Sequence, residues 1–253
     1  MPGASTAAPL EPGICQVWWA TPRFVTEGHV TLLCDVERRR RHAYRRAIDR
    51  DRFTLGAALI RIVVGLHTGQ HPGAVRVDRA CTTCGQPHGK PRLPGTGVEV
   101  SVSHSGERVA LACTLGAPVG IDVEEVSSGL DVALLAGAVL DASEAAHLAT
   151  IDEGLRRHAF VTYWTRKEAI VKATGDGLRV PLPSVSVSPP ERTPRLLGFE
   201  GRPELPGRVV MAQLWPGPDH IASLAVIGGS DAGEEPPLRT VELGALALLA
   251  PYA

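Results

Sequence analysis

The order of the predicted secondary-structure elements limits the fold of this 253-residue chain more than any other sequence feature. Two helices come first, then a strand hairpin, a further strand, two more helices and three short apolar runs that predict strands. A parallel sheet is typical of steady alternation between strands and helices, and this order does not alternate in that way. The sequence therefore favours an α+β fold, and two similar halves are compatible with it.

The first half is predicted to hold two helices and a hairpin. Residues 35–47 have helical composition, and residues 52–66 repeat apolar side chains at helical spacing. Alternating apolar residues predict a strand over residues 98–104, and a second strand over residues 109–114 follows the Ser-Gly-Glu turn. We expect His104 near the tip of this hairpin.

The second half is predicted to hold one strand, two helices and a closing group of strands. The strand covers residues 119–124, and the helices begin at about Ser143 and Leu155, the second ending at Thr174. Three apolar runs predict an antiparallel meander over residues 184–188, 208–215 and 220–227.

Composition shifts suggest where the chain divides. We expect an N-terminal half over residues 1–115, a C-terminal half over residues 116–228, and a linker with a C-terminal tail over residues 229–253. The linker prediction rests on the Gly-, Glu- and Pro-rich segment 228–237.

Charge and hydropathy exclude several classes of protein. The 26 basic and 27 acidic residues nearly cancel, which argues against a nucleic-acid binder whose whole surface is basic. Met1–Gly13 lacks the pattern of a secretory signal, and the apolar stretch 241–253 is shorter than a membrane span requires. We therefore expect a cytoplasmic monomer that contacts neither nucleic acid nor a membrane.

Five cysteines show no even framework, so reduced thiols are expected. Cys81 and Cys84, with His88 nearby, suggest zinc, but no second cysteine pair appears at matching spacing. The sequence alone therefore disfavours a zinc site.

Two acidic clusters carry the strongest chemical signal. In the predicted strand, Asp122 and Glu124 project from the same face with backbones about 7 Å apart. In the predicted helix, Trp164, Glu168 and Lys172 follow one another at i,i+4 spacing along one side. Taken singly, a solvated acidic strand and an ordinary Glu–Lys helix pair explain them. Together, three carboxylates and a lysine fit a hard metal ion, Mg²⁺ or Mn²⁺, with a phosphate.

Other side chains are candidates for phosphate contacts. His104 closes a strand beside Ser103, Lys90 lies in a Pro-rich loop, and Arg52 follows the arginine run of residues 38–46. Each of these also has an ordinary structural or surface explanation.

These residues resemble the motifs of the Sfp-type 4′-phosphopantetheinyl transferases. Residues 120–124 (Gly-Ile-Asp-Val-Glu) are similar to the family's G-[IV]-D-x-E motif, and residues 164–172 resemble its W-[ST]-x-K-E-[AS]-x-x-K motif. Residues 101–105 (Ser-Val-Ser-His-Ser) and 89–91 (Gly-Lys-Pro) resemble two further family motifs. The likeness spans roughly residues 35–228.

The resemblance implies a fold and a set of roles. The fold would consist of two similar α/β halves related by a pseudo-twofold axis, with coenzyme A and Mg²⁺ in the seam between them. The metal would be held by Asp122, Glu124 and Glu168. Coenzyme A would be bound by Lys172, His104, Lys90, Ser103, Arg52 and, where the family often has lysines, Arg39.

The implied reaction moves phosphopantetheine from coenzyme A to a serine of an apo acyl or peptidyl carrier protein, in fatty-acid, polyketide or peptide synthesis. Glu168, Lys172 and His104 are the expected catalytic residues, with Glu168 as the base. Two alternatives stay open: a non-catalytic sensor of coenzyme A or adenine nucleotides, and an interaction protein whose basic helix docks an acidic partner.

Overall fold

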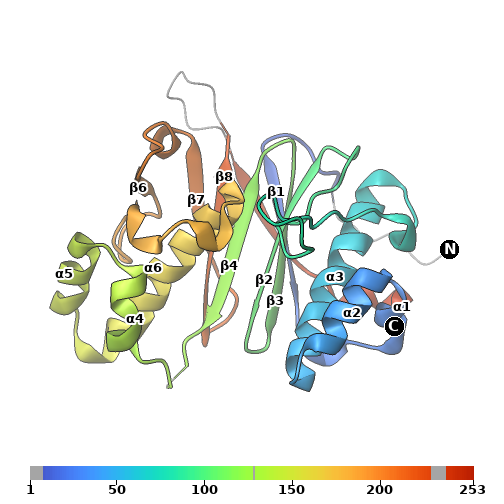
Figure 1. Ribbon diagram of the computed structural model, residues 1–253, viewed down its shortest axis with the longest axis horizontal. Helices are drawn as coiled ribbons and strands as arrows, with labels where there is room; N and C mark the ends of the chain where they lie inside the picture. The colour runs from blue at the N-terminus through green and yellow to red at the C-terminus, as the bar shows by residue number, and fades with distance from the viewer. Residues whose placement is uncertain (1–7, 128, 229–237) are drawn as a thin grey trace. The chain divides into compact units, whose positions relative to one another are not determined.

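The computed structural model describes residues 8–127, 129–228 and 238–253, and the chain forms two compact units (Figure 1). Unit 1 contains the described residues up to Gly116 together with Arg239–Ala253. Unit 2 contains those from Ala117 to Leu238. The division after Gly116 lies one residue from the expected boundary.

Unit 1 is built on a four-stranded sheet. In spatial order the strands are β2 (Val98–Ser105), β3 (Arg108–Leu115), β1 (Ile14–Ala20) and β9 (Arg239–Gly244). β3 is antiparallel to both of its neighbours, and β9 runs parallel to β1. The predicted hairpin is confirmed, and His104 pairs with Val109 close to its turn.

The helices of unit 1 are α1 (Glu27–Thr31), α2 (Asp35–Ala43), α3 (Ala47–Thr68) and α7 (Leu246–Leu249). The long helix α3 packs against β2 and β3. It begins five residues before the predicted start at residue 52, and Asp49 in its first turn pairs with Arg52 at 2.9 Å. An acidic side chain there is favourable because it faces the positive end of the helix dipole.

The C-terminal residues complete the sheet of unit 1. β9 pairs with β1, the Trp19 indole donates a hydrogen bond to the Glu242 carboxylate at 2.8 Å, and Leu249 is buried in the core. The expected C-terminal tail is thus corrected for residues 239–253, because apolar burial and strand pairing hold them in unit 1. The expected linker over residues 229–237 lies outside the described residues, as do residues 1–7 of the segment considered for a signal.

Unit 2 is built on a three-stranded antiparallel sheet. Its order is β4 (Val119–Glu125), β8 (His220–Ile227) and β7 (Val209–Leu214). A separate pair is formed by β5 (Val185–Val187) and β6 (Leu196–Phe199). The predicted meander is therefore correct only for the β7–β8 pair. β5 lies elsewhere because the Val187 amide donates to the Glu144 carboxylate at 3.0 Å, which ties this strand to a helix.

The helices of unit 2 are α4 (Val132–Val139), α5 (Ala142–Thr150) and α6 (Glu153–Thr174). α5 begins with a capping box, in which Asp141 and Glu144 each accept a hydrogen bond from the other's backbone amide. α6 ends at Gly175, whose φ of 77° is the left-handed conformation typical of a helix C-terminus.

Helix α6 lies unusually close to strand β4 at one glycine. A Cβ atom added to Gly120 would stand 1.9 Å from the Ala169 carbonyl oxygen and 2.4 Å from the Ala173 amide nitrogen. Real Cβ atoms do not approach backbone atoms so closely, so only glycine permits this packing.

Both units place one 22-residue helix against antiparallel strands, which agrees with the expectation of two similar halves. The content of helices and strands confirms the α+β class. Within the described part of the chain, no helix has both the length and the apolar character needed to cross a bilayer.

Replacing Gly120 by alanine should lower the free energy of unfolding by about 1–3 kcal/mol or more, because α6 must move away from β4. Gly137 provides the control: it lies within α4, nothing stands within 4 Å of its added Cβ, and alanine there should be neutral or stabilise by up to about 1 kcal/mol. Urea unfolding of both variants checks the prediction. Equal stability of the Gly120→Ala variant and the native protein would contradict it.

Candidate metal and phosphate site

The contact between β4 and α6 brings the two acidic motifs together. Asp122 lies on β4 and is 2% exposed, and its Oδ1 accepts a hydrogen bond from the Lys172 ammonium at 2.6 Å. Glu168 and Lys172 lie one turn apart on α6. They directly precede Ala169 and Ala173, the two residues whose backbone atoms lie against Gly120. The close approach at Gly120 is therefore what places these side chains beside Asp122.

Glu168 is half-buried and lies in an unfavourable electrostatic environment. Burial raises the pKa of its carboxyl above the ordinary value, the nearby Asp122 carboxylate raises the pKa further, and the Lys172 ammonium acts in the opposite direction. Two carboxylates and one ammonium thus share a small space, and the negative charge is not fully balanced there.

Glu124 is the third predicted carboxylate. It lies on β4 two residues after Asp122, so the two side chains project from the same face of the strand, and Glu124 is partly exposed. The alternate residues Val119, Ile121 and Val123 are fully buried, as the strand pattern predicts.

The residues fit a hard cation. Oxygen ligands from one or two carboxylates, completed by water and substrate phosphates, are typical of Mg²⁺ sites. The raised pKa of Glu168 beside Asp122 is the specific observation, because a cation between these carboxylates would relieve their repulsion. Asp122 and Glu168, with Glu124 on the same strand face as Asp122, are thus suited to hold Mg²⁺.

The other predicted residues lie in unit 1. His104 and Ser103 are on β2. Arg52 on α3 contacts the turn between β2 and β3, where its Nε donates to the Gly106 carbonyl oxygen at 2.9 Å. The structure thus places Arg52 close to the hairpin that carries His104.

Lys90 and Arg39 occupy different environments in unit 1. Burial lowers the pKa of Lys90 to about 8, although the Glu99 carboxylate opposes this shift. Arg39 is exposed on α2, whereas Arg40 lies over the Phe53 ring at 5.3 Å and Arg41 donates to the Thr54 hydroxyl at 3.0 Å. The side chains of Arg40 and Arg41 thus have structural contacts within unit 1.

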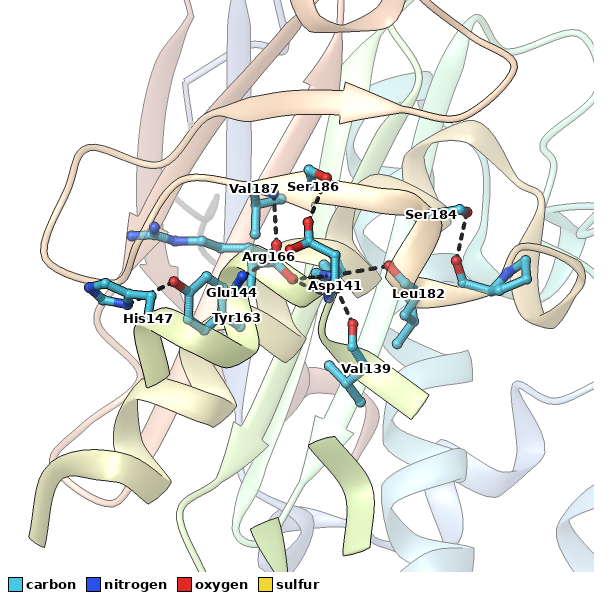
Figure 2. Close-up of polar contacts among 12 residues, drawn as sticks. Val139, Asp141, Glu144, His147, Tyr163, Arg166, Leu182, Ser184, Ser186 and Val187 are labelled. Atoms are coloured by element: carbon cyan, nitrogen blue, oxygen red, sulfur yellow. Dashed lines mark hydrogen bonds and ion pairs between the residues drawn. The ribbon is translucent and has the colours of Figure 1, made fainter. Parts of the chain in front are cut away.

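Two charged residues of the second motif have a structural role that the sequence analysis missed. Lys167 is fully buried, forms an ion pair with Glu144, and donates hydrogen bonds to the carbonyl oxygens of Val139 (2.8 Å) and Leu182 (3.2 Å). Figure 2 shows the surrounding network, in which Asp141 also accepts from the Ser186 hydroxyl at 2.6 Å. This network joins α5, α6 and β5.

Arg166 stabilises the segment after β5. Its guanidinium donates to the Ser188 and Pro189 carbonyl oxygens, both at 2.8 Å, and to those of Pro190 and Arg192. The burial of the neighbouring Lys167 could have been predicted from the sequence. Lys167 stands seven residues after Phe160 and four before Val171, which places it on the apolar stripe of the helix. A lysine in that position is buried and needs partners.

Replacing Lys167 by methionine should lower the free energy of unfolding by about 3–5 kcal/mol, because the buried Glu144 carboxylate loses its counter-charge. The double variant with Glu144→Gln removes the unpaired charge at the loss of one of the two backbone hydrogen bonds that the carboxylate accepts, from the Asp141 and Val187 amides, and should recover part of the loss. Urea unfolding of the single and double variants tests this. A double variant less stable than Lys167→Met would contradict it.

The raised pKa of Glu168 predicts a pH dependence of stability. Because its folded pKa exceeds the unfolded value, the contribution to stability is fully present below the unfolded pKa and is lost as pH rises through the folded pKa. In EDTA, the Glu168→Gln variant should therefore gain stability relative to the native protein as pH rises from about 4 towards 8. Urea unfolding across this range measures the difference.

The exposed Glu153 at the start of α6 provides a matched control, since its Gln variant should show no such gain. Adding Mg²⁺ should stabilise the native protein more than the Glu168→Gln variant. A constant difference across pH, together with no effect of Mg²⁺, would overturn the electrostatic description of the site.

Comparison with known proteins finds sequence similarity over this part of the chain. Residues 118–212 match the model of the 4′-phosphopantetheinyl transferase superfamily. The chain is 32% identical over 133 residues to the 4′-phosphopantetheinyl transferase HetI of Nostoc sp., covering 51% of this chain and 54% of that protein. It is 30% identical over 141 residues to the 4′-phosphopantetheinyl transferase Sfp of Bacillus subtilis, covering 55% of this chain and 58% of that protein.

The matches thus cover about half the length of these relatives. Among solved structures, the holo-[acyl-carrier-protein] synthase of Thermotoga maritima has a TM-score of 0.37 at 25% identity over 45% of this chain and 64% of that chain. The sequence matches confirm the predicted resemblance to the 4′-phosphopantetheinyl transferases, and both acidic motifs lie inside the matched residues 118–212.

Proposed function

We propose that this protein transfers the 4′-phosphopantetheine group of coenzyme A to a serine of an apo acyl or peptidyl carrier protein, giving the holo carrier and 3′,5′-ADP. The observation that carries the proposal is the 2.6 Å contact between Asp122 and Lys172, which joins the two motifs in one site beside Glu168. The match of residues 118–212 to the transferase superfamily supports it.

The reaction needs a base and a stabiliser of negative charge. The serine oxygen of the carrier forms a bond to the β-phosphorus of coenzyme A, and the bond from that phosphorus to the bridging oxygen breaks, so that 3′,5′-ADP leaves with the electron pair. Glu168, directly or through a water molecule, accepts the serine proton.

Lys172 has a suitable position for the phosphate. Its ammonium contacts Asp122 and is partly exposed, so it can also donate to a diphosphate oxygen and stabilise the charge that develops on it. Asp122, Glu124 and Glu168 would hold Mg²⁺, which supplies neutralising charge at the diphosphate when bound.

The unit 1 residues are proposed to bind the rest of coenzyme A. His104 would contact the diphosphate, Ser103 and Lys90 would lie along the nucleotide, and Arg52 would meet the 3′-phosphate with Arg39. A nearby phosphate would favour the protonated ammonium of Lys90 and so counter the lowering of its pKa by burial. We propose that the protein acts as a monomer.

The decisive experiment combines the protein with coenzyme A, Mg²⁺ and a panel of apo acyl and peptidyl carrier proteins. We expect at least one carrier to gain the mass of a phosphopantetheine group, with 3′,5′-ADP released in equal amount. The Glu168→Gln variant should lower kcat by about 10²–10⁴-fold, and the Glu153→Gln control should not. Binding of coenzyme A without transfer to any carrier would overturn the proposal in favour of a sensor.

A further inference from the structure

The loop that precedes Lys90 brings together three side chains that bind soft metal ions. Cys81, Cys84 and His88 each direct one ligand atom to a common point, and these atoms all lie within 4.8 Å of one another. The Cys84 Sγ and His88 Nε2 atoms are 3.0 Å apart. The lack of a second cysteine pair in the sequence disfavours zinc, but the fold shows that His88 joins the single pair directly.

The backbone of the loop holds the two thiols in position. The Gly85 amide donates to the Cys81 carbonyl oxygen at 2.9 Å, and the Cys81 amide donates to the Gln86 carbonyl oxygen at 2.8 Å. Gly85 has a φ of 71°, a conformation that glycine adopts without strain, and it turns the chain back directly after Cys84. The two cysteines therefore lie on one tight turn, and His88 lies on the returning strand of the loop.

The base of the loop is closed as well. The Gly89 amide donates to the Arg79 carbonyl oxygen at 2.7 Å, and Asp78 pairs with Arg92 through two backbone hydrogen bonds. An added Cβ on Gly89 would stand 2.9 Å from the Ala80 carbonyl oxygen, so the two sides of the base are packed together. The loop from Asp78 to Arg92 is thus closed at its base by backbone hydrogen bonds.

The tip of this loop, residues 81–88, has no apolar core. Cys84 and His88 are exposed, and Cys81 is only half-buried. Small segments without a core commonly depend on a cross-link, either a disulfide or a metal ion. The three ligand atoms at the centre of the loop provide the means for such a cross-link.

We propose that Cys81, Cys84 and His88 bind one zinc ion. Thiolate sulfur lies about 2.3 Å and imidazole nitrogen about 2.0–2.1 Å from zinc, so ligand atoms around a tetrahedral ion are separated by roughly 3.5–3.8 Å. The observed separations, from 3.0 Å to at most 4.8 Å, span this value, and small side-chain rotations suffice to reach it. Sulfur and nitrogen donors select zinc over the Mg²⁺ that suits the carboxylates of unit 2.

Three protein ligands leave one position of the tetrahedron to water. Within the described ranges, the group contains no fourth histidine, cysteine or carboxylate. Two thiolates balance the charge of Zn²⁺, and two arginines near the loop favour negatively charged ligands: Arg40 donates to the Pro87 carbonyl oxygen at 3.2 Å and Arg92 to that of Ala80 at 3.4 Å.

The site lies next to the residues proposed to bind coenzyme A. His88 is followed directly by the Gly-Lys-Pro segment of residues 89–91. A zinc ion would restrict the loop that presents Lys90. The metal site itself does not depend on the proposed transferase activity, because its ligands lie outside the acidic motifs.

The test is the metal content of the purified full chain. After expression with added zinc and dialysis against metal-free buffer, we expect about one zinc ion per chain by mass spectrometry of the metals. Cobalt exchanged into the site should give the intense ultraviolet absorption of cobalt–thiolate bonds. Cys84→Ser and His88→Ala should each weaken zinc affinity by on the order of a hundredfold or more, since each removes a ligand.

Cys34→Ser is the matched control, because Cys34 is also an exposed free cysteine but lies outside the group. It should retain zinc and the cobalt spectrum. Absence of zinc from the native chain, equal zinc in Cys84→Ser, or a disulfide between Cys81 and Cys84 in protein prepared with reductant and zinc would each overturn the proposal. If a variant fails to fold, cobalt titration of the native chain decides alone, since a spectrum without thiolate bands overturns the proposal.

Discussion

The close packing of α6 on β4 at Gly120 is the contact on which the site depends. Helix backbone atoms occupy the space where any other residue would carry its Cβ atom. With the helix at this distance, Lys172 reaches Asp122, and Glu168 lies near enough to Asp122 for the two charges to interact. A larger residue at position 120 would separate the two motifs without changing any of the charged side chains.

Neighbouring charged residues of helix α6 have two different roles, one in packing the helix and one in forming the site. Arg166 and Lys167 are buried and join α6 to α5, β5 and the segment that follows. Glu168 and Lys172 lie towards β4, where the carboxylates gather. The high density of charge in this motif therefore has two separate causes, because some of these charges orient the helix and others form the site.

The charges of the proposed site are compatible with a ligand that brings both a cation and an anion. Asp122 and Glu168 repel each other, which favours a metal ion, and the Lys172 ammonium favours a phosphate. Coenzyme A with Mg²⁺ has both properties. The Cys81, Cys84 and His88 group differs in kind, since its sulfur and nitrogen atoms suit a softer ion. Hard and soft ligand sets thus lie in different units of one chain.

The sequence was sufficient to predict the α+β class, most strands and helices, and the spacing that relates the acidic residues, because hydrophobic periodicity and caps act locally. It did not predict β1, whose apolar side chains do not alternate, or the place of β9, which pairs with a strand more than two hundred residues away. Three features become visible in the folded chain: Lys167 is structural, Gly120 sets the distance between the motifs, and His88 completes a group with Cys81 and Cys84. Such features depend on contacts between segments distant in the chain or on the path of a loop, and local residue patterns do not encode either.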